Sequence, residues 1–476
     1  MNLKTDLAGI VGSEHVSNDA DVLEKYSKDY SFVKARRPSC VAFPQNTEEV
    51  QELVKYANLN RVPVTPRSSP VGFYGAGIPG EGGIIADLTR MNRILEIDGL
   101  DRKVRVEPGV TWEQVQEELE KHGMMVCNPL LPHRSKSVLT SAMEREPILI
   151  PKYEYNETFL TAEMVLPGGE MFWTGTAIGK GHVGKCNPEG VIPSTRLFLG
   201  SQGTLGIATW ANLKTVYIPA IDELLFLPFN NIEDLITPLY QILRIRIGSE
   251  CFVLNGSNLA AMIAEDDKDI DAIKEDLPQW AIVLCLSGLN RHPEKKLAYE
   301  KEALMNIAER EQFEVCDTLG GISGLKETVL KLIRKPWKND TYWKFRPKGL
   351  SQDIFFHTTL DKVGEFTRAI NGVASKYRYP AADIGFYLQP KEQGRVGYCQ
   401  YSFNYDPDNT KDVSTVHDLY LEASQLAINM GGLFSNPYGA WADMVYSRAA
   451  TYTTVLKQVK DVFDPNRIMN PGKLCY

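Results

Sequence analysis

A glycine-rich segment is the first stretch of this chain whose residue types could do chemistry. Six glycines lie between residues 72 and 83, and prolines stand at positions 66, 70 and 79 around them. Glycine permits positive φ and lets a ligand approach main-chain N–H groups, while proline stiffens the same loop. Main-chain N–H groups arranged in this way bind phosphoryl oxygens without help from lysine. The segment therefore predicts a phosphate-binding loop, although an ordinary surface loop carries the same glycine and proline punctuation.

The sequence shows no comparable pattern of residues for binding a metal. None of the eight cysteines stands in a CxxC pair, and the seven histidines are dispersed without an HExxH spacing. We therefore expect no iron–sulfur, zinc or other metal site, and we expect the cysteines to be reduced, mostly buried thiols.

Composition narrows the class of protein. The chain has 476 residues, of which 43% are hydrophobic and 24% charged, and its net charge is -8. This balance is typical of a globular protein of two or more domains, and its scattered lysines and arginines argue against a nucleic-acid or anionic-membrane partner. No window approaches the roughly 18 consecutive apolar residues of a spanning helix, and the first residues lack a signal-peptide pattern. We expect a cytoplasmic protein with no membrane span.

The elements around the glycine segment form a strand, a helix and a second strand. Apolar residues recur at Val50, Leu53, Val54 and Ala57, which predicts a helix capped by Asn46 or Thr47. Further along, KVRVEPGVTWEQVQEELEKHGM predicts a strand, a turn and an amphipathic helix, and TAEMVLPGGEMFWTG predicts a hairpin.

The pattern of predicted helices and strands changes near residue 217. Longer helical stretches then alternate with apolar strands, and the last segment, TYTTVLKQVKDVFDPNRIMNPGKLCY, predicts a helix followed by a rigid strap. The fold class that we predict is α+β, with a second domain after the first.

Several motifs occur in an order that resembles one flavoprotein family. They are TEEVQELVKYANLNRVPVTPRSS with YGAGIPGEGGIIADLTRMNRILEID, then VRVEPGVTWEQVQEEL, SVLTSAMEREP, LFLGSQGTLGIATWANLKTV and FDPNRIMNPGK. In this order, over nearly the whole chain, they resemble the vanillyl-alcohol oxidase and p-cresol methylhydroxylase family. The resemblance implies a two-part FAD-binding domain over residues 1–217, joined by a C-terminal strap at 455–476, and a cap or substrate domain over 218–454.

The resemblance also implies which residues contact the cofactor. Glycines of 72–83 would lie against the FAD pyrophosphate, and the strap residues would lie near the isoalloxazine ring or the pocket wall. The expected FAD-binding residues are Arg67, Ser68, Ser69, Gly72, Tyr74, Gly75, Ala76, Gly77, Pro108, Gly109, Ser137, Thr140, Ser141, Gly203, Gly206, Ile207, Asn470 and Lys473.

Two branches of the family fit different parts of the sequence. One oxidises 4-alkylphenols and 4-hydroxybenzyl alcohols, and Tyr74 matches a tyrosine of its glycine loop. Its phenolate-binding Tyr-Arg pair is replaced here by Phe434 and Ser435, although Asn436 and Tyr438 stand just beyond, in what reads as a tight turn. The other branch oxidises D-2-hydroxy acids such as lactate or glycolate, and LFLGSQGTLGI is similar to it. The histidine-bearing strand of its metal-dependent members corresponds here to GRVGYCQYSFNYDPDN, which has no histidine.

Three residues are the candidates for catalysis. By the resemblance, Glu144 falls where an acidic residue lies near flavin N5 and accepts the substrate proton, although pairing with Arg145 is the structural alternative. Tyr74 either donates a hydrogen bond to a substrate oxygen or packs against the flavin. His357, on a predicted cap strand, is a substrate contact, a covalent flavin attachment point or a core residue; His133 is a further candidate near the cofactor.

The predicted function is hydride removal from the benzylic carbon of an aromatic alcohol or 4-alkylphenol to FAD. Because no second redox group is indicated, we expect electrons to pass to a partner protein, and we expect an oligomer that takes a small-molecule substrate. The alternatives are a D-2-hydroxy acid dehydrogenase subunit and a non-catalytic structural subunit of a redox complex.

Overall fold

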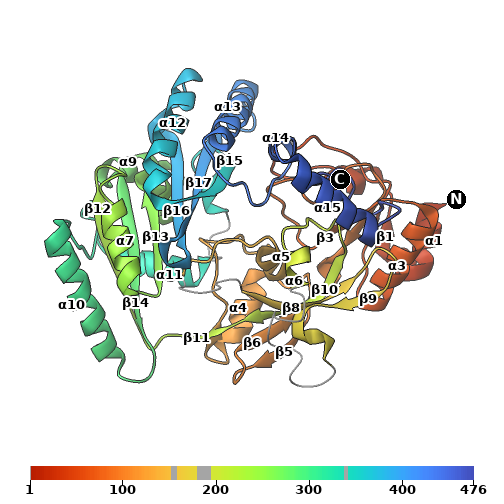
Figure 1. The fold of residues 1–476 in the computed structure, drawn as a ribbon, viewed down its shortest axis with the longest axis horizontal. Coiled ribbons are helices and arrows are strands. Elements are labelled where there is room, and N and C mark those ends of the chain that lie inside the picture. The colour runs from red at the N-terminus through yellow and green to blue at the C-terminus, as the bar shows by residue number, and fades with distance from the viewer. Residues whose placement is uncertain (1, 152–157, 180–193, 337–340) are drawn as a thin grey trace.

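The computed structural model describes residues 2–151, 158–179, 194–336 and 341–476. Three sheets, of four, five and six strands, organise the chain (Figure 1). The two smaller sheets come from the N-terminal part, and the six-stranded sheet lies beside them with its own helices (Figure 1). The expected α+β class is confirmed.

The four-stranded sheet carries the glycine loop. Strands β3 and β4 both run parallel to their neighbours, and the loop joins them. In spatial order the strands are β1 (Val16–Ser17), β2 (Cys40–Ala42), β4 (Ile84–Asp87) and β3 (Val64–Arg67). The helices around them are α1 (Leu3–Val11), α2 (Ala20–Lys25) and α3 (Thr47–Asn60).

Helix α3 is the helix predicted from its apolar spacing. All four of its predicted core residues, Val50, Leu53, Val54 and Ala57, have no exposed surface. Asn46 is the cap, because its side-chain oxygen accepts a hydrogen bond of 2.8 Å from the N–H of Glu49. The helix therefore covers the sheet from which the glycine loop extends.

The five-stranded sheet is antiparallel and forms the other wall of the N-terminal part. Its strands, in spatial order, are β5 (Ile94–Asp98), β6 (Lys103–Val106), β10 (Ile207–Lys214), β8 (Phe159–Val165) and β9 (Met171–Trp173). The predicted hairpin is β8 and β9. Helices α4 (Trp112–Glu120), α5 (Val138–Met143) and α6 (Thr195–Phe198) accompany it, and the short strands β7 (Met124–Met125) and β11 (Val216–Tyr217) pair beside it. Trp112, Val115 and Leu119 of α4 are buried, as their spacing predicts.

The six-stranded sheet is antiparallel throughout. Its strands, in spatial order, are β12 (Ile221–Phe229), β14 (Trp280–Gly288), β13 (Glu250–Asn255), β16 (Ile384–Lys391), β17 (Val396–Tyr405) and β15 (Leu350–Thr358). Helix α10 packs on β14, and α12 and α13 pack on each other beside β15 and β17. The helices of this part are α7 (Ile236–Ile245), α8 (Gly256–Ile263), α9 (Ile270–Asp276), α10 (Pro293–Glu311), α11 (Leu325–Arg334), α12 (Val363–Lys376) and α13 (Thr410–Asn429).

The chain then returns to the N-terminal part. Helices α14 (Ala440–Tyr446) and α15 (Ala450–Phe463) lead back across the molecule (Figure 1). The strap after α15 runs beside β3, where Val64 donates to the carbonyl of Ile468 at 2.7 Å and Asn470 donates to the carbonyl of Val64 at 2.8 Å. The last residues therefore complete the sheet that carries the glycine loop.

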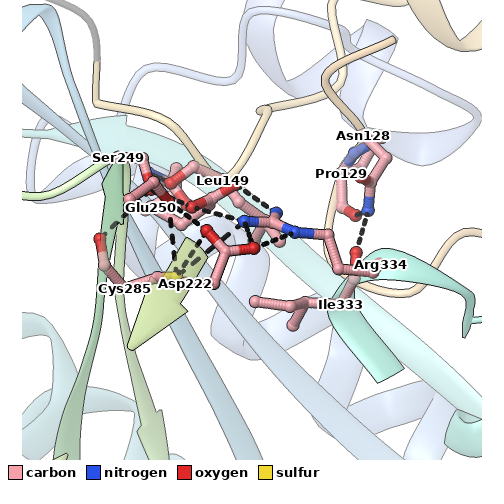
Figure 2. Close-up of polar contacts among 11 residues, drawn as sticks. Asn128, Pro129, Leu149, Asp222, Ser249, Glu250, Cys285, Ile333 and Arg334 are labelled. Carbon is pink, nitrogen blue, oxygen red and sulfur yellow. Dashed lines mark hydrogen bonds and ion pairs between the residues drawn. The ribbon is translucent and has the colours of Figure 1, made fainter. Parts of the chain in front are cut away.

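The segment from Asn128 to Leu149 joins the N-terminal part to the six-stranded sheet (Figure 2). At one end the Asn128 amide donates to the carbonyl of Ile333 at 3.1 Å, and at the other end the carbonyl of Leu149 accepts from the N–H of Cys251 at 3.1 Å. This segment carries several of the residues expected in the site, and both of its ends are bonded to the C-terminal part of the chain.

Arg334, the last residue of helix α11, anchors this helix to strands β12 and β13. Its guanidinium lies between the carboxylates of Asp222 and Glu250, 3.0 Å from the first, with the sulfur of Cys285 beside it (Figure 2). The Glu250 carboxylate is buried and that of Asp222 is partly exposed, so Glu250 in particular needs such a cation in place of water.

No helix in the described ranges is long and apolar enough to cross a membrane. The cysteines that the structure describes are all free thiols, and Cys186 lies outside the described residues.

Candidate functional site

Two adjoining cavities lie where the three sheets meet. The first, with about 1080 Å³ of space between protein atoms, lies between the glycine loop and the five-stranded sheet. The second has about 820 Å³ and is lined mainly by segment 128–149 and the six-stranded sheet. Five of the lining residues are shared by both cavities: Phe73, Tyr74, Lys136, Glu144 and Tyr438. These five residues form the junction between the cavities.

The glycine loop is shaped by close backbone packing. Gly75 adopts φ of 79°, and its N–H donates to the carboxylate of Asp29 at 2.7 Å. A Cβ on Gly80 would lie 1.9 Å from the carbonyl oxygen of Pro471, so only glycine fits there against the strap. Within the described residues, the N–H groups of Ala76 and Gly77 donate to no protein acceptor. The loop therefore offers the unpaired main-chain donors that an anion requires.

Most of the residues predicted to bind FAD line the first cavity. These are Arg67, Ser68, Ser69, Gly72, Tyr74, Ala76, Gly77, Pro108, Thr140, Gly203, Gly206 and Ile207. They come from the glycine loop, the turn before α4, helix α5 and the turn before β10, which are distant in sequence. The fold thus brings together the residues of four separate motifs.

Four other predicted residues support the walls without lining the cavity. Gly75 shapes the loop, and the N–H of Gly109 donates a hydrogen bond of 2.7 Å to the carbonyl of Met91. Ser137 caps helix α5 through the N–H of Thr140, and Ser141 accepts from the indole N–H of Trp112 at 3.0 Å. Their polar groups therefore bond to the protein itself.

The two strap residues lie behind the glycine loop. The ammonium of Lys473 donates to the carbonyl of Gly75 at 2.7 Å, and the amide of Asn470 donates to the carbonyl of Ala76 at 3.0 Å and to that of Gln202 at 2.7 Å. Neither residue lines either cavity. This placement differs from the expected contact with the isoalloxazine ring or the pocket wall. Both residues instead hydrogen-bond the glycine loop and so stabilise its conformation.

Glu144 lies at the junction in a cluster of charges. Its carboxylate contacts the ammonium of Lys136 at 2.7 Å, and the same ammonium also contacts Glu146. Burial raises the pKa of the Glu144 carboxyl; Lys136 opposes this rise, and Glu146 adds to it. The nearby hydroxyl of Tyr438 lowers the pKa of the Glu144 carboxyl and so also opposes the rise. A carboxylate with a raised pKa beside both cavities is suited to accept a proton.

Lys136, Glu146 and Tyr438 are site residues that the sequence reasoning missed or set aside. Pairing with Arg145 is the structural alternative for Glu144, whereas the ammonium that contacts its carboxylate is that of Lys136, at the other end of helix α5. Asn436 and Tyr438 read as a tight turn, but Tyr438 lines both cavities and Asn436 donates to the main-chain carbonyl of Glu144.

Tyr74 is packed on a second tyrosine at the junction. Its ring stacks on that of Tyr438 with centroids 5.2 Å apart, and its hydroxyl lies 3.5 Å from a carboxylate oxygen of Asp353. Asp353 in turn accepts from Lys344 at 2.6 Å and from Gln400 at 2.9 Å. Burial, followed by the charge of Asp353, raises the pKa of the Tyr74 hydroxyl well above its usual value. Tyr74 therefore acts at the junction as a neutral phenol.

His357 and His133 both line the second cavity and not the first. Burial, followed by the charges of Lys391 and Arg145, lowers the pKa of His357 to about 3. Burial also lowers the pKa of His133. Both imidazoles are therefore neutral near pH 7. Phe434 packs in the core against Phe356 with centroids 5.5 Å apart.

Aromatic side chains make up ten of the 22 residues that line the second cavity, and charged and small polar side chains and prolines supply most of the rest. Its aromatic side chains are Phe73, Tyr74, His133, Tyr342, Trp343, Phe355, His357, Tyr387, Tyr398 and Tyr438. Neighbouring rings contact one another edge to face or offset, as in Tyr74 and Phe355 with centroids 5.0 Å apart. We call this space the aromatic cavity. In the described part of the chain, no cluster of three or more His, Cys, Asp and Glu side chains has an arrangement that could hold a metal ion.

Family comparisons cover nearly the whole chain. Residues 38–175 match the FAD binding domain, and residues 223–474 match the C-terminal domain of FAD linked oxidases. The mitochondrial D-lactate dehydrogenase [cytochrome] of Arabidopsis thaliana is 30% identical over 460 residues, which are 93% of this chain and 75% of the relative. D-2-hydroxyglutarate dehydrogenase of Stutzerimonas stutzeri (strain A1501) is 24% identical and covers 98% of both chains.

A solved structure shares the fold. The crystal structure of p-cresol methylhydroxylase with substrate bound superposes with a TM-score of 0.85 at 18% identity, over 99% of this chain and 96% of that one. The resemblance inferred from the motif order is confirmed.

Proposed function

The chain belongs to the family of FAD-linked oxidases, and from this premise we propose that it oxidises the benzylic carbon of an aromatic alcohol or 4-alkylphenol. It is an FAD-dependent oxidoreductase. The observation that carries the proposed substrate class is the aromatic cavity, which adjoins the first cavity through Glu144 and Tyr438. Aromatic walls favour a flat ring by offset and edge-to-face contacts.

The first cavity offers FAD a close approach to the main chain and hydrogen-bond donors. Glycines 72, 77, 200, 203 and 206 line it, so a bound group can approach the main chain closely. The unpaired N–H groups of Ala76 and Gly77 would hold the pyrophosphate, and Ser68 and Thr140 would add hydroxyl contacts. Bound FAD supplies the hydride acceptor of the reaction.

The junction residues supply the proton chemistry that we propose. Glu144 would accept the proton of the substrate hydroxyl at a carboxylate oxygen, because its raised pKa favours the protonated form after transfer. Lys136 holds that carboxylate in position, and the hydroxyl of Tyr438 nearby lowers the pKa of the same carboxyl. Tyr74, held as a neutral phenol, donates to Asp353 at 3.5 Å, and it would have to turn from this long contact to donate to a substrate oxygen.

A D-2-hydroxy acid is the second candidate substrate. The sequence relatives that support it are named as dehydrogenases of D-lactate and D-2-hydroxyglutarate. The aromatic cavity is also lined by Lys136, Arg145 and Lys344, and a cation at this site would attract a substrate carboxylate. Lys136 and Lys344 are each already paired with carboxylates of the protein, which weakens this candidate.

We further propose that electrons leave the reduced enzyme to a partner protein. The proposal rests on the absence of a second redox-group motif in the sequence. The Arabidopsis relative is a D-lactate dehydrogenase [cytochrome], which supports a protein acceptor for this chain as well. Peroxide formation in air at the rate of substrate turnover would refute this part.

Anaerobic mixing tests the substrate proposal directly. The purified, FAD-loaded protein is mixed with a panel of benzylic alcohols, 4-alkylphenols and D-2-hydroxy acids, and the loss of flavin absorbance is followed. We expect rapid bleaching by a benzylic alcohol or alkylphenol. Bleaching by D-lactate or D-2-hydroxyglutarate alone would favour the second candidate, and bleaching by none, with dithionite still reducing the flavin, would favour a non-catalytic subunit.

A further inference from the structure

The two strap residues behind the glycine loop bond to consecutive peptide groups. The carbonyl of Gly75 accepts from the ammonium of Lys473 at 2.7 Å, and the carbonyl of Ala76 accepts from the amide of Asn470 at 3.0 Å. The N–H groups of these same two peptides are those of Ala76 and Gly77. Neither N–H donates to an acceptor in the part of the chain that the structure describes. Each strap residue therefore holds the carbonyl of a peptide whose N–H is available to a ligand.

The geometry of the peptide group links the strap to these N–H groups. A trans peptide is planar, and its C=O and N–H point in opposite directions. Because both carbonyls are directed toward the strap, the N–H groups of Ala76 and Gly77 face away from it. Ala76 and Gly77 line the first cavity, whereas Asn470 and Lys473 do not. The strap therefore sets the direction of two main-chain donors that an anion in this cavity would use.

The strap is itself held firmly against the sheet. Asn470 is 1% exposed, its side-chain oxygen accepts from the hydroxyl of Thr65 at 3.0 Å, and its main-chain N–H donates to the carbonyl of Val64 at 2.8 Å. The same amide that bonds the loop also donates to the carbonyl of Gln202 at 2.7 Å. The two loop peptides are therefore oriented by the protein alone.

Lys473 carries a buried charge without a paired carboxylate. It is 8% exposed, and within the described residues its ammonium donates only to the carbonyl of Gly75. The similarly buried ammonium groups of Lys103, Lys136 and Lys460 each contact a carboxylate, at 2.6 to 2.8 Å. A buried cation without a counter-ion is costly, so an anion bound at the loop would stabilise the charge of Lys473.

Two charged groups of the segment before β2 act on Lys473. Burial lowers the pKa of Lys473 to about 8; the charge of Asp29 opposes this fall, and that of Arg36 adds to it. The Asp29 carboxylate is already engaged, because it accepts from the N–H of Gly75 at 2.7 Å. An anion bound at the loop would favour the ammonium form, so binding above pH 8 would take up a proton.

We propose that Lys473 and Asn470 are positioning residues for FAD, which hold the loop carbonyls so that the N–H groups of Ala76 and Gly77 are presented to the pyrophosphate, and that the charge of Lys473 makes FAD affinity depend on pH. The inference rests on the proposed placement of the pyrophosphate at this loop. It gives the strap a role in the affinity for the cofactor, although its side chains line neither cavity.

Titration of the apoprotein with FAD, followed by flavin fluorescence, tests the positioning role without turnover. Lys473→Met and Asn470→Gly remove the two strap donors, and glycine tolerates the φ of 39° at position 470. We expect the Kd for FAD to rise by roughly 10- to 150-fold in each variant, the fold-change for a lost hydrogen bond to a charged group. The control is Lys296→Met, which removes a lysine that donates to the carbonyl of Ser287 in the six-stranded part and should bind FAD as the parent does.

The pH dependence of the Kd separates this role from a general weakening of the fold. The parent Kd should rise above about pH 8, by up to roughly tenfold per pH unit, because binding then requires proton uptake at Lys473. Asn470→Gly should keep this rise, and Lys473→Met should lose it. A rise that persists in Lys473→Met would overturn the inference, and so would a parent Kd that stays constant between about pH 7.5 and 9.5.

The remaining outcomes distinguish the inference from the proposed FAD site. FAD binding by the parent with an unchanged Kd in both strap variants overturns the inference alone. A parent that binds no FAD overturns the placement of the cofactor as well. If the Lys473→Met apoprotein shows no cooperative thermal transition, the parent titrations over pH and the Kd of Asn470→Gly still decide.

Discussion

Glu144→Gln is the substitution that tests the mechanism most directly. The amide keeps the shape of the side chain but cannot accept the substrate proton. We expect the rate of flavin reduction to fall roughly 10²- to 10⁴-fold, which is the usual contribution of a positioned base. This range corresponds to about 3 to 5 kcal/mol in the activation barrier. Lys136 keeps its contact with Glu146 in the variant, so the local fold and the FAD content should hardly change.

The pH dependence of flavin reduction separates a base from a structural partner. A base acts when it is deprotonated, so the parent rate should rise with pH through the pKa of Glu144, which burial holds above 4.5. The Gln variant should lose this limb. Stopped-flow absorbance under anaerobic conditions, over a series of pH values and at saturating substrate, measures both effects.

Glu146→Gln is the matched control for this experiment. It also removes a carboxylate from Lys136, but it leaves the proposed base in place. Because the charge of Glu146 raises the pKa of Glu144, its removal should move the limb to lower pH without abolishing it. If Glu144→Gln reduces its flavin at the parent rate, Glu144 is a structural partner of Lys136, and Tyr74 becomes the next residue to test.

Three further predictions concern groups that hold the site. Arg334→Met leaves the buried carboxylate of Glu250 and the partly exposed one of Asp222 without their cation and should lower the free energy of unfolding by about 3 to 5 kcal/mol, measured by urea denaturation; an unchanged urea midpoint would contradict the assigned pairing. Burial lowers the pKa of Lys473 to about 8, so the folded state binds fewer protons than the unfolded chain between pH 8 and about 10.4; this residue therefore makes stability rise with pH in that window, and Lys473→Met should flatten the rise. Because the pKa of His357 is about 3, His357→Gln should leave the shape of the pH profile of flavin reduction unchanged between pH 5 and 8, and loss of a limb there would show that the imidazole titrates.

Local patterns in the sequence account for much of the fold. Helix α3 has the predicted apolar face and cap, since both depend only on residues a few positions apart. The glycine loop, the hairpin of β8 and β9 and the buried face of α4 follow in the same way. Most of the residues expected around the cofactor line one cavity, because the order of the motifs indicated a family fold in which they converge.

The charge pairing at the junction could not be read from the chain. Lys136 and Glu144 flank helix α5, and the contact of Lys136 with Glu146 depends in addition on how the backbone turns at Arg145, which has φ of 57°. Tyr438 enters the site only because the chain returns after α13, and Asp353 approaches Tyr74 from strand β15. Such contacts between distant segments are set by tertiary packing and leave no local periodicity in the sequence.

The position of the strap in the chain has a consequence for biosynthesis. Lys473 is bonded to a carbonyl 398 residues earlier, so the glycine loop leaves the ribosome long before the residues that hold it. At ordinary translation rates of about 5–20 residues per second, the loop waits roughly 20 to 80 s for the strap. FAD should therefore be captured after translation has passed residue 473, and a nascent chain stalled before that point should emerge without tightly bound flavin.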